Sequence, residues 1–154
     1  MTETWLAPYL DRMEEMSRLF FRYFHARIEA EGGLSPSQFF VLKILKADGT
    51  VTVSDLAQKL GVSTAGATGL IDRLVKADLV QRCRDENDRR IVWVRLSDEG
   101  VRQLAAASQT RRQIFAELLA PLSQAEVEQW VRLYEKIYQG IPSLTPGPEV
   151  CPKE

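Results

Sequence analysis

Residues 54–97 read SDLAQKLGVSTAGATGLIDRLVKADLVQRCRDENDRRIVWVRLS. The first seven of them predict one compact helix, which Gly61 ends because glycine readily takes the left-handed conformation found after helices. Ser63 is a natural N-cap for a second helix, expected from Thr64 to about Ala77. Two strands are predicted next, over residues 79–84 and 91–96, on either side of a charged turn.

This order of short helix, turn, second helix and hairpin is that of a winged helix-turn-helix, a motif that places its second helix in the major groove of DNA. At the turn, Val62 is expected to fill the gap between the two helices. Apolar spacing predicts one buried face on the second helix. Its members are Ala67, Leu70, Ile71 and Leu74.

The segments on both sides of this motif are predicted to be helical, because apolar residues recur at helical spacing from Leu6 to Ile28 and again after Ser97 and Gln124. The fold class is therefore mainly α with a small β-wing (α+β). Four parts are expected: an N-terminal dimerisation helix (1–33), the winged helix-turn-helix DNA-binding domain (34–97), C-terminal dimerisation helices (98–141) and a flexible tail (142–154).

A homodimer is expected because the first and last helices carry apolar stripes that are too long for the small motif between them to cover. A second copy of the chain would cover these stripes in a two-fold interface. The same arrangement would space two recognition helices about one DNA turn apart, which matches a pseudo-palindromic operator.

The composition favours a cytoplasmic regulator over an enzyme or a membrane protein. No apolar run approaches the roughly 18 residues that cross a bilayer, and no signal peptide is visible. The two cysteines, Cys83 and Cys151, are too few for a disulfide framework. His25 is the one histidine, and there is no phosphate-binding loop or metal-ligand cluster, so neither catalysis nor a cofactor or metal is expected.

The formal net charge of −1 does not indicate a nucleic-acid partner, but the distribution of charge does. Five arginines and three acidic residues lie between Arg82 and Arg95. Arg89 and Arg90 are placed to reach a minor groove, and Asp88 is expected to orient a neighbouring arginine. The full set of expected DNA contacts is Ser54, Ser63, Thr64, Ala65, Thr68, Arg73, Lys76, Asp88, Arg89 and Arg90.

Two glycines inside the second helix, Gly66 and Gly69, each cost about 1 kcal/mol of helix stability relative to alanine. One interpretation is close packing against a neighbouring element. The other is a close approach of the backbone to DNA. Because short side chains occupy the first half of the exposed face, we expect modest sequence discrimination from this helix and more from the hairpin and DNA shape.

The motif resembles the MarR family of regulators. The resemblance covers roughly residues 34–119. It is carried by Leu56-Ala57, Gly61-Val62-Ser63, Asp72-Arg73-Leu74, Leu79-Val80, Asp88-Arg89-Arg90 and Leu96-Ser97-Asp98-Glu99-Gly100. It implies a homodimer that binds a pseudo-palindromic operator, usually as a repressor, with Arg90 in the minor groove and Asp88 holding the wing. The chain departs from many relatives at Gly69, where they carry arginine.

The same resemblance implies a small aromatic or phenolic effector bound between the dimer helices and the winged part. Candidate lining residues on the aromatic-rich first helix are Tyr9, Phe20, Phe24 and His25. The other interpretation of this aromatic stripe is core or dimer interface.

Two alternatives to a ligand-responsive repressor stay open. A redox-responsive regulator would use Cys83, although strand alternation sends Arg82 and Arg84 to the opposite face from its thiol. A winged-helix module that binds protein would suit the near-neutral charge, but it would not need paired arginines at the hairpin tip.

Overall fold

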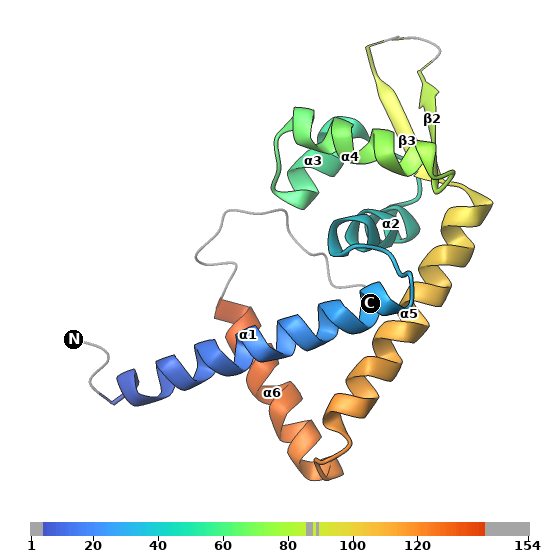
Figure 1. The fold of residues 1–154 in the computed structure, drawn as a ribbon. Helices are drawn as coiled ribbons and strands as arrows, with labels where there is room; N and C mark the ends of the chain where they lie inside the picture. The colour runs from blue at the N-terminus through green and yellow to red at the C-terminus, as the bar shows by residue number, and fades with distance from the viewer. Residues whose placement is uncertain (1–4, 86–87, 89, 141–154) are drawn as a thin grey trace.

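The computed structural model describes residues 5–85, 88 and 90–140. In order along the chain these residues form α1 (Ala7–Ala30), α2 (Pro36–Asp48), β1 (Val51–Thr52), α3 (Val53–Leu60), α4 (Thr64–Lys76), β2 (Val80–Arg84), β3 (Val92–Leu96), α5 (Asp98–Leu119) and α6 (Gln124–Gly140). The mainly helical fold with a small wing is confirmed (Figure 1). The expected flexible tail and Cys151 lie outside the described residues.

Local capping chemistry sets the helix boundaries. Ser35 and Gln38 form a capping box at the start of α2, and Gly61 ends α3 with φ 65°. The Ser63 hydroxyl accepts the backbone N–H of Gly66, 3.1 Å away, at the start of α4. Such side chains satisfy amide groups that a helix cannot pair within itself. The boundaries predicted from Gly61 and Ser63 are confirmed.

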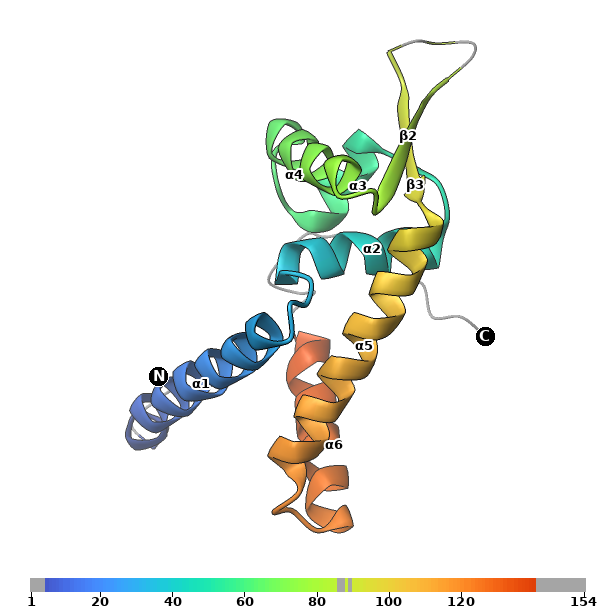
Figure 2. The ribbon, with the colours of Figure 1, turned by 45° about the vertical axis from the view of Figure 1, so that its right-hand side comes forward.

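The sheet has the order β1-β3-β2, with both pairs antiparallel. Val51 lies opposite Val94, and Val94 lies opposite Arg82. Side chains alternate between the two faces, so Val80 and Val94 are buried while Cys83 is exposed. The hairpin formed by β2 and β3 projects beyond the helices (Figures 1 and 2).

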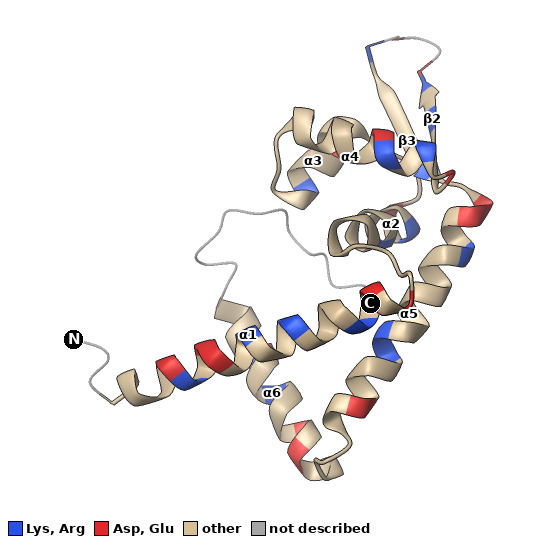
Figure 3. Cartoon of the chain, viewed as in Figure 1, with Lys and Arg blue, Asp and Glu red and all other residues tan. Residues whose placement is uncertain are grey.

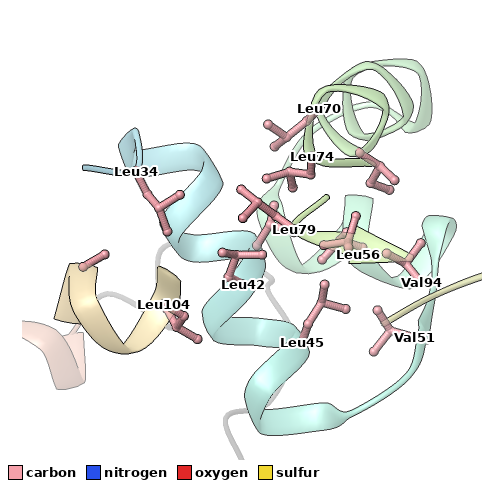
Figure 4. Close-up of a cluster of buried hydrophobic side chains, with 14 residues drawn as sticks. Leu34, Leu42, Leu45, Val51, Leu56, Leu70, Leu74, Leu79, Val94 and Leu104 are labelled. Atoms are coloured by element: carbon pink, nitrogen blue, oxygen red, sulfur yellow. The ribbon is translucent and has the colours of Figure 1, made fainter. Parts of the chain in front are cut away.

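The core lies between α2 and the elements packed around it (Figure 4). Leu42 and Leu45 of α2 are almost completely inaccessible to solvent, as are Leu56 of α3 and Leu74 of α4. We refer to residues 36–96, from α2 to β3, as the winged lobe. Val62 does not belong to its core, because its side chain is 47% exposed. The prediction that Val62 fills the gap between the two helices is therefore wrong.

Helix α5 leaves the winged lobe through a tightly packed junction. The buried Ser97 caps α5 through the N–H of Gly100, and its hydroxyl also donates to the carbonyl of Asp78. A Cβ at Gly100 would clash with the carbonyl oxygen of Leu79. The start of α5 is therefore pressed against the loop between α4 and β2, and only glycine fits at position 100.

A second contact joins the middle of α5 to α2. The Arg111 guanidinium lies 3.7 Å from the ring centre of Phe39 and donates to the carbonyl of Leu34 at 3.1 Å. Partial burial lowers the pKa of Arg111 below its ordinary value. The stacking and the carbonyl bond compensate for that burial, since a guanidinium is favoured on aromatic faces.

The outer helices α1 and α6 bury little of their surface. Ile28 is the one buried residue in the described part of α1, and no residue of α6 is buried. Near its end, α1 contacts α5 through Arg27, which lies 2.5 Å from Glu117; this hydrogen bond raises the pKa of Arg27 above its ordinary value. None of the helices in the described part of the chain could span a membrane.

Candidate nucleic-acid interface

Helix α4 and the β2–β3 hairpin lie at the same end of the molecule, opposite the α5–α6 turn (Figures 1 and 2). Most of the expected contact residues face solvent there. Exposed ones are Ser54 of α3, the cap Ser63, and Thr64, Ala65, Arg73 and Lys76 of α4; Thr68 is half-buried. Figure 3 shows that charged residues colour the hairpin and the second half of α4, while its first half is uncharged.

The first turn of α4 is ordered by hydroxyl groups. Ser63 uses its side chain as the cap, and the Thr68 hydroxyl donates to the carbonyl of Thr64 at 2.8 Å. The Thr68 proton is therefore engaged within the helix, which leaves its oxygen lone pairs and its methyl group for a partner. Apolar contact with a thymine methyl is one recognition mode open to such a side chain.

The two helical glycines differ in their surroundings. A Cβ at Gly66 would lie 3.3 Å from the Ser63 hydroxyl and 3.8 Å from the Val62 Cβ, so the cap crowds this position. A Cβ at Gly69 would meet nothing within 4 Å. Close packing against a neighbouring element is therefore wrong for Gly69 within the described residues, and at Gly66 the nearby atoms belong to the cap of α4 itself and to the turn before it.

The hairpin tip is organised by two carboxylates. Asp88 accepts the backbone N–H of Arg90 at 3.0 Å, and the Arg90 Nε lies 3.4 Å from the same oxygen. The expectation that Asp88 orients a neighbouring arginine is confirmed. The Arg90 side chain remains 94% exposed, so its orientation is biased while its charge stays accessible. Arg89 lies outside the described residues.

Asp85 is a structural residue of the tip that sequence reasoning missed. Its carboxylate accepts the N–H of Asp88 at 3.0 Å through one oxygen and the indole N–H of Trp93 at 3.0 Å through the other. This ties the turn to β3. The signal available in the sequence was the tryptophan in the return strand, because a half-buried indole needs an acceptor.

Arg82 is directed away from the hairpin tip. Its Nη1 lies 2.6 Å from Asp72 Oδ1, and its Nη2 donates to the carbonyl of Thr68 at 3.2 Å. Arg95 is also engaged, with its Nε donating to Gln81 Oε1 at 3.2 Å. Of the five arginines that the sequence places between Arg82 and Arg95, Arg82 therefore faces α4 and is paired there.

Of the four expected effector residues, Phe20 and Phe24 come together, but Tyr9 and His25 do not join them. Phe20 and Phe24 stack on each other and both contact Phe115 of α5, with ring centres 5.2–5.9 Å apart. Tyr9 and His25 are exposed and belong to no such cluster in the described residues. The contacts of Phe20 and Phe24 match the core or interface interpretation of the aromatic stripe.

A hollow of about 380 Å³ lies on the far face of the hairpin, lined by Thr50, Cys83, Trp93 and Arg95. Cys83 is thus exposed, on the opposite side of β2 from Arg82, as alternation predicts. Among residues 5–85, 88 and 90–140, no group of three or more His, Cys, Asp or Glu side chains could hold a metal ion.

Comparison with known proteins defines the class. The model of the MarR family matches residues 34–92. The HTH-type transcriptional repressor MdtR of Bacillus subtilis is 33% identical over 107 residues, covering 70% of this chain and 69% of MdtR. The chain belongs to the MarR family. It is a DNA-binding transcriptional regulator and not an enzyme.

Solved structures support the same fold. A MarR family protein from Bacillus stearothermophilus has a TM-score of 0.76 and 26% identity, over 92% of this chain and 98% of that one. A mutant of MarR from E. coli, in complex with operator DNA, has a TM-score of 0.67 and 23% identity, over 88% and 99% of the two chains. The latter likeness concerns the fold alone.

Proposed function

We propose that this protein is a repressor that binds a pseudo-palindromic operator as a homodimer, with α4 in the major groove and the hairpin tip in the adjacent minor groove. One observation carries the proposal. The exposed Arg90 stands at the end of a hairpin that projects beside α4, and Asp88 biases its direction. A helix and an arginine so arranged suit the two adjacent grooves of B-DNA.

The repressor role is supported by the likeness to MdtR, and operator binding is the behaviour of the E. coli MarR mutant in its crystal. The expected contacts on this chain are Ser54, Ser63, Thr64, Ala65, Thr68, Arg73, Lys76, Asp88, Arg89 and Arg90. Contacts from serine and threonine position the helix on phosphates, while Arg90 reads groove width.

The homodimer is supported by the surface of α6. Five of its large side chains are 38–64% exposed although they share one helical stripe. They are Trp130, Val131, Tyr134, Ile137 and Tyr138. This exposed apolar stripe is continued by exposed residues on α1. A second copy of the chain, related by a two-fold axis, would bury both surfaces at once. The outer helices are then the dimerisation parts.

A small aromatic or phenolic effector is the proposed release signal, bound where α1 and α5 meet the winged lobe. Phe20 and Phe24 offer ring faces at that junction once their contact with Phe115 is rearranged. A change in the packing of α1 on α5 would alter the angle between the winged lobe and the outer helices. Operator binding by the proposed dimer requires that angle to be fixed.

The test is DNA binding by the purified protein across a salt series, with an A·T-rich palindromic duplex and the Arg90→Ala variant. Removing one phosphate-directed or groove-directed cation should weaken binding by about tenfold and lower the salt dependence by about one counterion. Arg102→Ala removes the same charge from α5 and should change neither quantity. If Arg90→Ala binds as the parent does, the proposed wing contact is wrong.

A further inference from the structure

Arg82 lies at the base of the hairpin and connects it to α4. In the antiparallel ladder it is opposite Val94, which is completely buried, and it shares a strand face with the buried Val80. Alternation thus points Arg82 inward, toward the winged lobe. Its long side chain extends beyond the apolar core and reaches the side of α4, where it is 30% exposed.

The guanidinium of Arg82 contacts two successive turns of α4. One nitrogen is 2.6 Å from Asp72 Oδ1, and another donates to the carbonyl of Thr68 at 3.2 Å. Thr68 and Asp72 are four residues apart, so they lie one above the other on the same helix face. A planar, forked donor that holds both fixes the orientation of the helix better than a single point charge could.

These contacts join the two elements that the proposed function sends into different grooves. Asp72 follows the exposed first half of α4, and Arg82 precedes the tip that carries Arg90. If α4 were free to tilt against the hairpin, only one of the two could dock at a time. When two contacting groups are held in a fixed relation, the second contact loses less entropy once the first has formed.

We propose that Arg82 and Asp72 form a positioning pair, which fixes the angle between α4 and the wing and so allows major-groove and minor-groove contacts to form together. Neither side chain touches DNA in this arrangement. The inference rests on the proposed function, because it takes α4 and the hairpin tip as the two DNA-binding elements.

The competing explanation is that Arg82 leaves Asp72 and contacts a phosphate when DNA binds. The two explanations predict opposite effects of Asp72→Asn. If Asp72 holds Arg82 in place, its neutralisation should weaken DNA binding by about fivefold, the upper range for one solvent-accessible ion pair. If Arg82 is a phosphate contact, the same substitution removes a repulsive charge and frees a cation, so binding should tighten.

The experiment compares Asp72→Asn, Arg82→Gln and the double variant by DNA binding over a salt series. A positioning pair predicts that each single variant weakens binding by about fivefold, that the double variant is no worse than either, and that the salt slope stays unchanged. Arg95→Gln is the matched control, since it removes a hairpin arginine from the opposite strand face. It should bind as the parent does.

Two outcomes would overturn the positioning pair: tighter binding by Asp72→Asn, or a salt slope that falls by about one in Arg82→Gln. Thermal unfolding must be recorded for every variant. If the loss of affinity occurs only where the variant is partly unfolded, the pair is merely structural and the proposal is wrong. Arg90→Ala separates this failure from failure of the proposed function, because it tests the tip contact without disturbing Arg82 or Asp72.

Discussion

The winged lobe and helix α6 use apolar residues in opposite ways. In the lobe, Leu42, Leu56 and Ile71 are completely buried, whereas Trp130, Tyr134 and Ile137 of α6 are 38–64% exposed. The lobe therefore obtains its stability from contacts within one chain. Helix α6 also carries large apolar side chains, but none of its residues is buried by the part of the chain that the structure describes. The winged lobe therefore buries its apolar residues within one chain, whereas α6 leaves an exposed apolar stripe that the proposed dimer would cover.

The largest effect is expected from substitutions in the apolar stripe of α6. Tyr134→Glu combined with Ile137→Glu places charges in the proposed dimer interface and should yield a monomer in sedimentation. Affinity for a palindromic duplex should fall by about 10²- to 10⁴-fold, because the second half-site no longer benefits from a linked copy. Lys136→Glu, on the opposite face of α6, is the control and should remain dimeric. A dimeric double variant would contradict the role given to α6.

A substitution in the core of the winged lobe should instead lower the free energy of unfolding. Leu74 is fully buried in the lobe core, so Leu74→Ala should lower the free energy of unfolding by about 2–5 kcal/mol, measured by urea denaturation. Val75→Ala, at the neighbouring position that is 39% exposed, should change it by less than about 1 kcal/mol. Equal effects of the two would mean that the lobe core is not where stability resides.

The junction between the winged lobe and α5 is probed by Ser97→Ala. The substitution removes the α5 cap and leaves the buried N–H of Gly100 and carbonyl of Asp78 without their partner. A loss of about 1–2 kcal/mol in the free energy of unfolding is expected. Ser97→Thr keeps the hydroxyl and should retain most of that stability. If alanine is tolerated as well as threonine, the cap does not hold α5 to the lobe.

The smallest effect concerns the two glycines of α4. Because a Cβ at Gly69 meets nothing within 4 Å, Gly69→Ala should raise the free energy of unfolding by up to about 1 kcal/mol. Gly66→Ala should gain less, since the Ser63 hydroxyl crowds that position. Close approach of the backbone to DNA predicts weaker DNA binding for Gly69→Ala despite its greater stability. Unchanged binding would remove that interpretation.

Most of the fold could be predicted from the sequence, because its boundaries depend on local chemistry. Ser35, Ser63 and Ser97 cap the helices that follow them, and Gly61 takes the left-handed conformation that a helix end requires. Each of these features acts within four residues along the chain. The spacing of buried residues in α4 is equally local, so the face formed by Leu70 and Leu74 was predicted correctly.

The parts that could not be predicted depend on contacts distant in the sequence. Arg82 and Asp72 are ten residues apart on different elements, and the charge pattern alone made Arg82 one more basic residue of the wing. Val62 followed the general tendency of apolar residues to be buried, yet the way the turn folds leaves it exposed. Asp85 resembled an ordinary turn residue until Trp93 was placed beside it.

The close contact of Gly100 with Leu79 fixes the start of α5, so a small tilt there moves the other end of the helix by a larger distance. Helix α5 is one uninterrupted element of 22 residues, about 33 Å long at 1.5 Å per residue. A tilt of about 5° at the Gly100 end displaces the other end by about 3 Å over that length. Because Arg111 holds the middle of α5 to the lobe as well, such a tilt would have to move the lobe and the helix together, and in the proposed dimer it would change the distance between the two lobes.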